Sequence, residues 1–418
     1  MQSGVGLEER LPEFLASKEK EVTEFLCDLI RIPSTRGNEG PAAQYLYSRL
    51  QELGGECELV AIPESIVEDE HYAFRVEGLT YAGRPNLRLL RKGEGGGRSA
   101  LLNTHIDVVP PSKMQERPFD PIVRDGVIYG RGACDAKGQI AAIYLLLLAL
   151  KELELDLKGD VEVHLVIEEE PGANGTLAMV RRGCRSDAAI VLEPSSLAIM
   201  PSVRGAVWFE LTCYGRAGHS GSPGPRVSAI KKAYEAMMIL EGYHDRLLTA
   251  SRGHPLYDQF ENPMPLTFGM MEAGEWPAAT PDKAVVKGVF GFLPPRTKRE
   301  IQREMREAIA GEGDDWLRDN FEIRFPMLNL DFSETRTDHP LVKELEQACR
   351  QSGVEPRLSA LTGSCDATHY NVIAGIPAVV FGAGSLSHAH SKDEQIGVAE
   401  VLKAAQILTN FLLRWCAE

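Results

Sequence analysis

The sequence predicts an α/β protein in which a mostly parallel sheet, covered by helices on both faces, carries an inserted smaller α+β unit. Two observations favour this fold class. Short apolar strands alternate with helices near both ends of the chain, and strands of alternating polarity lie between them. The length of 418 residues exceeds the about 250–300 residues at which single hydrophobic cores stop growing, so we expect two domains.

The first half of the chain alternates helix and strand. Apolar residues at helical spacing predict one helix over residues 7–30, ended by Ile32-Pro33-Ser34, and a second over 41–53, ended by Gly54-Gly55. The further elements expected in this half are strands at 86–90, 100–105, 161–167 and 188–192 and helices at 139–153 and 176–182. Fully apolar strands of this kind are typical of a sheet that is buried on both faces.

The pattern changes after Pro194. Alternating strands are expected at 207–214, 266–271, 284–292 and 321–325, with helices at 227–248 and 298–309. From residue 338 the α/β style resumes, with a helix to 351, a strand at 378–381 and a closing helix from 398. We therefore predict one domain from residues 1–201 and 329–418, interrupted by an inserted domain over 202–328 with two helices on a four-stranded sheet.

Composition excludes several classes of protein. A net charge of −15 argues against nucleic acid or an anionic membrane as the main partner. The longest apolar run, residues 140–150, is about half of the ~20 residues that span a bilayer, and the N-terminus does not resemble a signal peptide. The eight cysteines include no C-x-x-C pair, which favours reduced thiols and a cytoplasmic location.

The strongest local motif is NTHIDVVP, which holds His105 and Asp107 at the end of an apolar strand. Open α/β sheets bind their ligands at the carboxyl ends of strands, and positions i and i+2 share one strand face. A metal-ligating histidine needs an acceptor for its second ring nitrogen, and Asp107 is suitably placed. The motif alone is equally compatible with a strand-end histidine followed by a solubilising aspartate.

Two further motifs place carboxylates next to glycine-rich turns. Asp135 in GRGACDAKG lies before a buried helix, where an ordinary N-cap is the alternative interpretation. Glu168, Glu169 and Glu170 in EEEPGANGT follow a fully apolar strand. Three like charges at a strand end repel one another, so this arrangement favours a compensating cation over a simple solvated run of acids.

Two more strand ends carry similar side chains. Glu193 follows the strand at 188–192, and His388 and His390 follow the strand at 378–381. Imidazoles and carboxylates gathered at one sheet edge suit two borderline divalent ions such as zinc, with one carboxylate bridging them and one left as a general base. The side chains that make up this set are His105, Asp135, Glu169, Glu170, Glu193 and His390.

Taken in order, the motifs HIDVVP, GRGACDAKG, EEEPGANGT, LEP, GRAGHS and AHSKDE resemble those of the co-catalytic zinc aminoacylase and carboxypeptidase family. That family includes acetylornithine deacetylase, succinyl-diaminopimelate desuccinylase and glutamate carboxypeptidase. The resemblance runs over nearly the whole chain. It implies that the interrupted domain binds the metals and is catalytic, and that the inserted domain serves as a lid and dimerisation domain.

The resemblance implies a role for each motif. The first metal is expected to be bound by His105 and Glu193, with His105 oriented by Asp107, and the second by Glu170 and His390, with Asp135 bridging both. Glu169 corresponds to the general base, and Glu168 to a structural position. His219, in the inserted domain, corresponds to a histidine that polarises the scissile carbonyl, often from the partner subunit. The expected cofactors are two divalent ions per chain, Zn²⁺ first, with Co²⁺ or Mn²⁺ as alternatives.

The chain departs from the family pattern where arginines often hold a substrate carboxylate. Gly291 and Thr368 stand at those positions, and Arg204, Arg226 or His369 are the candidates to compensate. We expect a metal-dependent amidohydrolase that removes the acyl group from a small N-acylated amine or amino acid, acting as a homodimer. The alternatives are an exopeptidase, either a carboxypeptidase or a dipeptidase, on the same scaffold, and a catalytically inactive binding protein.

Overall fold

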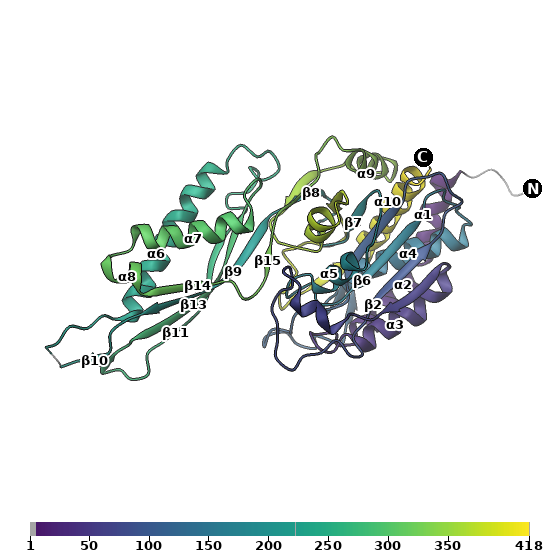
Figure 1. Ribbon diagram of the computed structural model, residues 1–418. Coiled ribbons are helices and arrows are strands. Elements are labelled where there is room, and N and C mark those ends of the chain that lie inside the picture. The colour runs from purple at the N-terminus through teal and green to yellow at the C-terminus, as the bar shows by residue number, and fades with distance from the viewer. Residues whose placement is uncertain (1–5, 222, 418) are drawn as a thin grey trace, which may run out of the picture.

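Two lobes joined by two strand connections make up the computed structural model, which describes residues 6–221 and 223–417 (Figure 1). The larger lobe contains a nine-stranded sheet. Its strands, in spatial order, are β1 (Glu56–Val60), β2 (Asn86–Arg91), β6 (Val161–Val166), β3 (Ala100–His105), β7 (Ala189–Val191), β18 (Ala378–Val380), β8 (Ile199–Val203) and β16 (Ser333–Glu334), with β17 (Leu358–Leu361) paired to β8.

The direction of these strands corrects one prediction. The sheet was expected to be mostly parallel, but it is mixed. The pairs β3–β6, β3–β7, β7–β18 and β8–β17 are parallel, whereas β1–β2, β2–β6, β8–β18 and β8–β16 are antiparallel. A strand buried on both faces is apolar whichever way it runs, so the hydrophobic pattern carries no information about direction.

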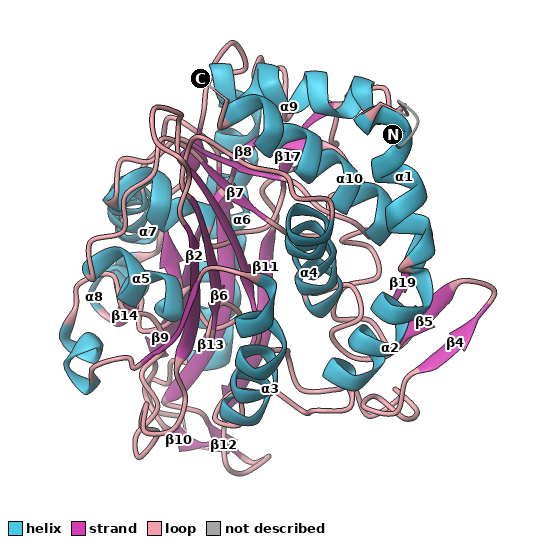
Figure 2. Ribbon diagram, turned by 90° about the vertical axis from the view of Figure 1, so that its right-hand side faces the viewer, coloured by secondary structure: helices cyan, strands magenta, loops and turns pink. Residues whose placement is uncertain are grey.

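Helices cover both faces of this sheet, as the turned view shows (Figure 2). Successive side chains of β3 point to opposite faces: Leu102 belongs to the large core with the long helices, and Leu101 to a smaller core with Tyr370. The large core includes side chains of α1 (Leu7–Ser17), α2 (Glu19–Ile30), α3 (Gly40–Leu50), α4 (Lys137–Glu152), α9 (Pro340–Gln351) and α10 (Val398–Trp415). The other face carries α5 (Asn174–Arg181) and a π-helical turn, His369–Ile373.

The single helix expected over residues 7–30 is two helices. Lys18 separates α1 from α2, with a backbone conformation (φ −96°, ψ 3°) outside the helical range. Both segments have helical periodicity, so the sequence pattern continues through the break. Short 3₁₀ helices follow α3 and β1, at Gln51–Leu53 (η1) and Glu64–Glu68 (η2).

The smaller lobe is an antiparallel sheet with helices packed on one face. It has five strands where four were expected, because the two-residue β15 also pairs with β9. Its elements are β9 (Gly205–Tyr214), α6 (Ala229–Ala250), β11 (Leu266–Ala273), β13 (Lys283–Phe292), α7 (Lys298–Glu312), α8 (Asp315–Asp319), β14 (Phe321–Arg324) and β15 (Asn329–Leu330). The chain enters this lobe after β8 and leaves it before β16; the domain boundaries near residues 202 and 328 stay a proposal.

Two small sheets complete the fold. One pairs β10 (Gly218–His219) with β12 (Ala279–Thr280) in the smaller lobe, and the other joins β4 (Ile122–Arg124), β5 (Val127–Tyr129) and β19 (Gln395–Gly397) in the larger lobe. All eight cysteines are unpaired. Across residues 6–221 and 223–417, none of the helices combines the length and the apolar character needed to cross a membrane.

Candidate metal centre

The predicted ligands come together at one edge of the nine-stranded sheet. His105 ends β3, and the acidic turn that holds Glu169 and Glu170 follows β6. Glu193 follows β7, and the loop with His390 follows β18. These four strands form a continuous parallel set, so their carboxyl ends meet at the same edge. Short connections after each strand therefore bring distant parts of the sequence into one cluster.

Asp135 lies between two histidines. Its Oδ1 is 2.9 Å from His105 Nε2, and its Oδ2 is 3.3 Å from His390 Nε2. His390 Nε2 is also 3.0 Å from a carboxylate oxygen of Glu170. A carboxylate that presents one oxygen to each imidazole has the geometry of a ligand bridging two metal ions.

Two overlapping ligand sets follow from these positions. Ligand atoms of His105, Asp135 and Glu170 lie within 4.8 Å of one another, and so do those of His105, Glu169 and Glu193. One oxygen of Glu193 is buried and has no hydrogen-bond partner among the described residues, as expected for an atom that binds a metal ion. Imidazole and carboxylate donors at this spacing fit two divalent ions.

Asp107 contacts both His105 and the acidic turn, although the sequence suggested only the contact with His105. The Nδ1 atom of His105 lies 2.9 Å from the main-chain carbonyl oxygen of Asp107 and 3.7 Å from its carboxylate. That carboxylate instead accepts hydrogen bonds from the backbone N–H groups of Glu169, at 3.1 Å, and Glu170, at 3.2 Å. Asp107 therefore orients His105 through its backbone and the acidic turn through its side chain.

Glu394 positions Asp135 and was missed by the sequence analysis. Its buried carboxylate accepts from the backbone N–H groups of Cys134, at 3.2 Å, and Asp135, at 3.1 Å, and it pairs with Arg131. In the sequence it is one acid of the exposed-looking string SKDE, 259 residues from Asp135. Only the packing of the loop before β19 against the turn before α4 identifies its role.

Glu168 has a structural environment, in line with the role expected for it. Its fully buried side chain receives hydrogen bonds from Arg84 at 2.6 Å, Tyr81 at 2.9 Å and Asn174 at 2.9 Å. Arg84 also pairs with the buried Glu39. These contacts turn Glu168 away from the ligands and fix the start of the acidic turn.

Charge at the centre is unbalanced unless cations are present. Burial raises the pKa of Glu169 and of Glu193, and the nearby acids add to the shift in both. Burial works against the charged form of His105, yet its contacts with Asp107 and Asp135 raise its pKa well above the usual value. Asp135 and Glu170 raise the pKa of His390 to about 10. The raised pKa values mean that buried carboxylates are protonated or are paired with protonated histidines. A divalent ion would stabilise the same carboxylates in their charged form more strongly.

A further acid, Asp366, lies behind the centre. It is fully buried, and burial raises its pKa to about 7. Its charge contributes to the raised pKa of both Glu169 and Glu193. In the sequence, this segment was considered only because Thr368 stands where an arginine is often found. An acid just beyond the apolar segment of β17 was the available signal.

His219 is not brought to the centre within this chain. It belongs to β10, at the end of the smaller lobe that points away from the larger lobe (Figure 1). The side chain is exposed, and its Nδ1 accepts from the backbone N–H of Gly221 at 3.0 Å. Arg226 donates to the carbonyl oxygens of His219 and Ser220, so it supports this loop.

The other two compensating candidates lie between the lobes. The Arg204 guanidinium sits against Gly291, because a Cβ atom at that glycine would meet Arg204 Nη1 at 3.0 Å. Arg204 is 9% exposed and donates to main-chain carbonyl oxygens, including that of Thr362. His369 is buried, and its Nε2 has no partner among the described residues.

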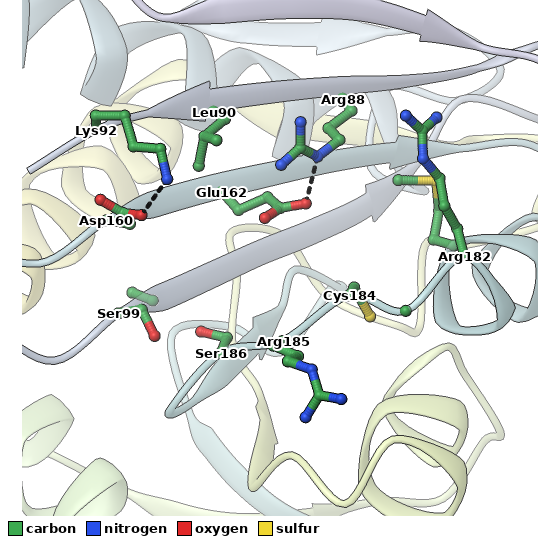
Figure 3. Close-up of a pocket in the computed structure, with 13 residues that line it drawn as sticks. Arg88, Leu90, Lys92, Ser99, Asp160, Glu162, Arg182, Cys184, Arg185 and Ser186 are labelled. Atoms are coloured by element: carbon green, nitrogen blue, oxygen red, sulfur yellow. Dashed lines mark hydrogen bonds and ion pairs between the residues drawn. The ribbon is translucent and has the colours of Figure 1, made fainter.

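A separate polar cavity of about 430 Å³ lies at the opposite, amino edge of the sheet (Figure 3). Its basic groups are matched by acids: Arg88 pairs with Glu162 at 2.6 Å, and Lys92 with Asp160 at 2.8 Å. The lining residues contain none of the candidate metal ligands. The chemistry therefore belongs at the carboxyl edge.

Comparison with known proteins identifies similar sequences and a similar fold. The sequence profile of peptidase family M20/M25/M40 matches residues 101–414. The chain is 27% identical over 370 residues to N-formyl-4-amino-5-aminomethyl-2-methylpyrimidine deformylase of Bacillus subtilis, covering 81% of this chain and 84% of that protein. It is 29% identical to acetylornithine deacetylase of Myxococcus xanthus over 94% of this chain and 96% of the relative.

Among solved structures, a dinuclear metal-binding peptidase of the M20 family from Bacillus subtilis superposes with a TM-score of 0.68. The alignment covers 96% of this chain and 99% of that one at 16% identity. At this identity the likeness concerns the fold, which is an α/β fold with a mixed sheet.

Proposed function

This chain belongs to peptidase family M20/M25/M40 and is a metal-dependent hydrolase of carbon–nitrogen bonds, and we propose that it removes the acyl group from a small N-acylated amine. The observation that carries the proposal is Asp135, which presents its two oxygens to His105 and His390. A bridging carboxylate between two imidazoles suits a pair of divalent ions that activate one water molecule. Zn²⁺ is the ion we propose, because nitrogen and oxygen donors suit it.

The residues at the centre divide into two roles. His105 and Glu193 are assigned to the first ion, Glu170 and His390 to the second, and Asp135 to both. When bound, the ions supply a water of lowered pKa and polarise the substrate carbonyl.

Glu169 is assigned as the general base. Its partly buried carboxylate lies beside the ligands, in one set with His105 and Glu193. It accepts the proton of the attacking water and returns it to the departing amine nitrogen. Asp107 keeps Glu169 in place through the backbone hydrogen bond described above.

We assign His219 to the stabilisation of the oxyanion, and its position requires a second chain or a large lobe movement. The exposed apolar side chains of the smaller lobe support a homodimer through that lobe. Ile230, Tyr234 and Met238 recur every four residues on α6, and Met270 and Met271 project from β11, an edge strand. We propose that in such a dimer the partner supplies its own His219 loop to the metal centre.

The side chains at the junction of the two lobes indicate whether the amine part of the substrate carries a carboxylate. Without arginines at positions 291 and 368, an amine that lacks a carboxylate, such as the compound named for the deformylase relative, suits the site. Arg204 favours a second candidate, an exopeptidase or amino-acid deacylase, because its buried guanidinium has no acidic partner within the described residues and could bind a substrate carboxylate. We propose the cytoplasm as the location, in keeping with eight unpaired cysteines.

A hydrolysis screen with zinc-loaded protein tests the function. N-formyl, N-acetyl and N-succinyl derivatives of amines without a carboxylate and of amino acids are compared with dipeptides, with Glu169→Gln as the inactive control. Hydrolysis of acyl amines that lack a carboxylate supports the first proposal. A strict requirement for a carboxylate, lost in Arg204→Met, supports the second. Wild-type activity equal to that of the Glu169→Gln control on every substrate would indicate a binding protein.

A further inference from the structure

The two lobes touch beside their strand connections, where the loop after η2 meets the start of α7. Lys298 Nζ lies 3.4 Å from His71 Nδ1, and Arg299 Nη2 lies 3.3 Å from Glu70 Oε2. Lys298 also donates to the carbonyl oxygen of Asn329 at 3.1 Å. A lysine ammonium has only donors, so His71 accepts this hydrogen bond through the lone pair of a neutral imidazole.

A second histidine backs the contact. The His369 ring lies edge-on to His71, with 6.4 Å between ring centroids. Burial, together with the charges of His71 and Lys298, lowers the pKa of His369 to about 3, so this imidazole stays neutral. The partly exposed ring of His71 therefore lies between an ammonium from one lobe and a neutral ring from its own lobe.

The acids near His71 already have cationic partners. Asp69 is held by Arg181 of α5, at 2.7 and 3.1 Å, and Glu70 faces Arg299. Burial and Lys298 lower the pKa of His71, whereas Glu70 and Asp69 oppose the shift and Arg181 adds to it. On the side of α7, Lys298 is surrounded by Asp331, Arg299, Glu70 and Asp69, and burial lowers its pKa.

We propose that Lys298, His71 and His369 form a proton-operated latch that holds the two lobes in this orientation and releases them when His71 is protonated. A proton on Nδ1 removes the only acceptor that the ring offers Lys298 and places two cations in contact. The latched state favours neutral His71, so the latch is intact near neutral pH. It is lost as pH falls from about 6.5, the ordinary value for histidine, toward the lowered pKa.

Within that pH window each unit shifts the ratio of open to latched molecules by up to about tenfold, because one proton is taken up on release. Small-angle X-ray scattering of the full chain between pH 8.0 and 5.5 measures the change, with circular dichroism to confirm that the protein stays folded. The radius of gyration of the wild type is expected to rise as pH falls. This readout requires no substrate, so it is independent of the proposed reaction.

Two variants separate the latch from general acid effects. His71→Gln keeps an acceptor that cannot titrate, and its radius of gyration should stay constant over the range. Lys298→Met removes the donor and should be open already at pH 8.0. His339→Gln, which removes a titrating ring at the N-cap of α9, serves as the matched control and should behave as the wild type. A wild type insensitive to pH, or a His71→Gln protein that opens like the wild type, would overturn the proposal.

Discussion

The substitution Asp107→Asn tests how the metal centre is held together. It is nearly isosteric, and Asp107 is 1% exposed, so the change acts on hydrogen bonds and on one negative charge while leaving the packing intact. The carboxylate accepts from the backbone N–H groups of Glu169 and Glu170, and the amide can serve only one of them while turning its NH₂ group toward the other. The carbonyl oxygen that orients His105 belongs to the backbone and is unchanged.

The expected cost follows from these contacts. A hydrogen bond to a charged group contributes about 1.5–3 kcal/mol, and loss of an outer-shell partner typically lowers metal affinity by about 10–100-fold. We expect this loss of affinity for the second ion, because its proposed ligand Glu170 follows the disturbed backbone. The affinity for the first ion should change by less than about threefold, which is within the scatter of single-contact energies.

Competitive titration of zinc against a chromophoric chelator resolves the two binding steps. Asp160→Asn is the matched control, because Asp160 also accepts from a backbone N–H group, that of Gly93, but lies outside the centre. Preferential loss of the first ion in Asp107→Asn would show that the carboxylate acts on His105, as the sequence motif alone suggested, and would refute the assignment made from the structure.

The remaining predictions concern single residues. Asp135→Ala should abolish binding of both ions, measured by metal analysis after gel filtration; unchanged stoichiometry would contradict the bridging role. Glu169→Gln should eliminate turnover at nearly unchanged metal content, whereas Glu170→Gln should lose the second ion; equal metal loss in both would reverse the assignment. His219→Ala should lower kcat by about 10²–10³-fold with both ions retained, and mixing it with Glu169→Gln should restore activity if the partner supplies His219. Arg84→Met leaves the buried Glu39 carboxylate without its cation and should lower the free energy of unfolding by about 3–5 kcal/mol in urea titrations; a loss below about 1 kcal/mol would indicate that water replaces the guanidinium.

The types and approximate places of the candidate metal ligands followed from the sequence. His105, Glu170, Glu193 and His390 lie together at one sheet edge, where their positions after apolar strands predicted them, and Asp135 joins them from the turn before α4. The inference works because strand periodicity is local and parallel strands end at the same edge. The fold class followed for the same reason, apart from the directions of strands such as β2 and β8.

What the sequence could not determine depends on contacts between distant segments. The carboxylate of Asp107 serves the turn after β6, Glu394 holds the turn before α4 across 259 residues, and His219 lies far from the ligands that its motif accompanies. Each of these facts depends on how loops and lobes pack against one another. The spacing of residues within a short stretch of sequence does not reveal that packing. The sequence by itself therefore determined which atoms are available to hold two ions, because chemistry and periodicity are local. Only the tertiary structure decided which backbone and buried charges orient those atoms, because orientation arises from contacts between segments that meet only after folding.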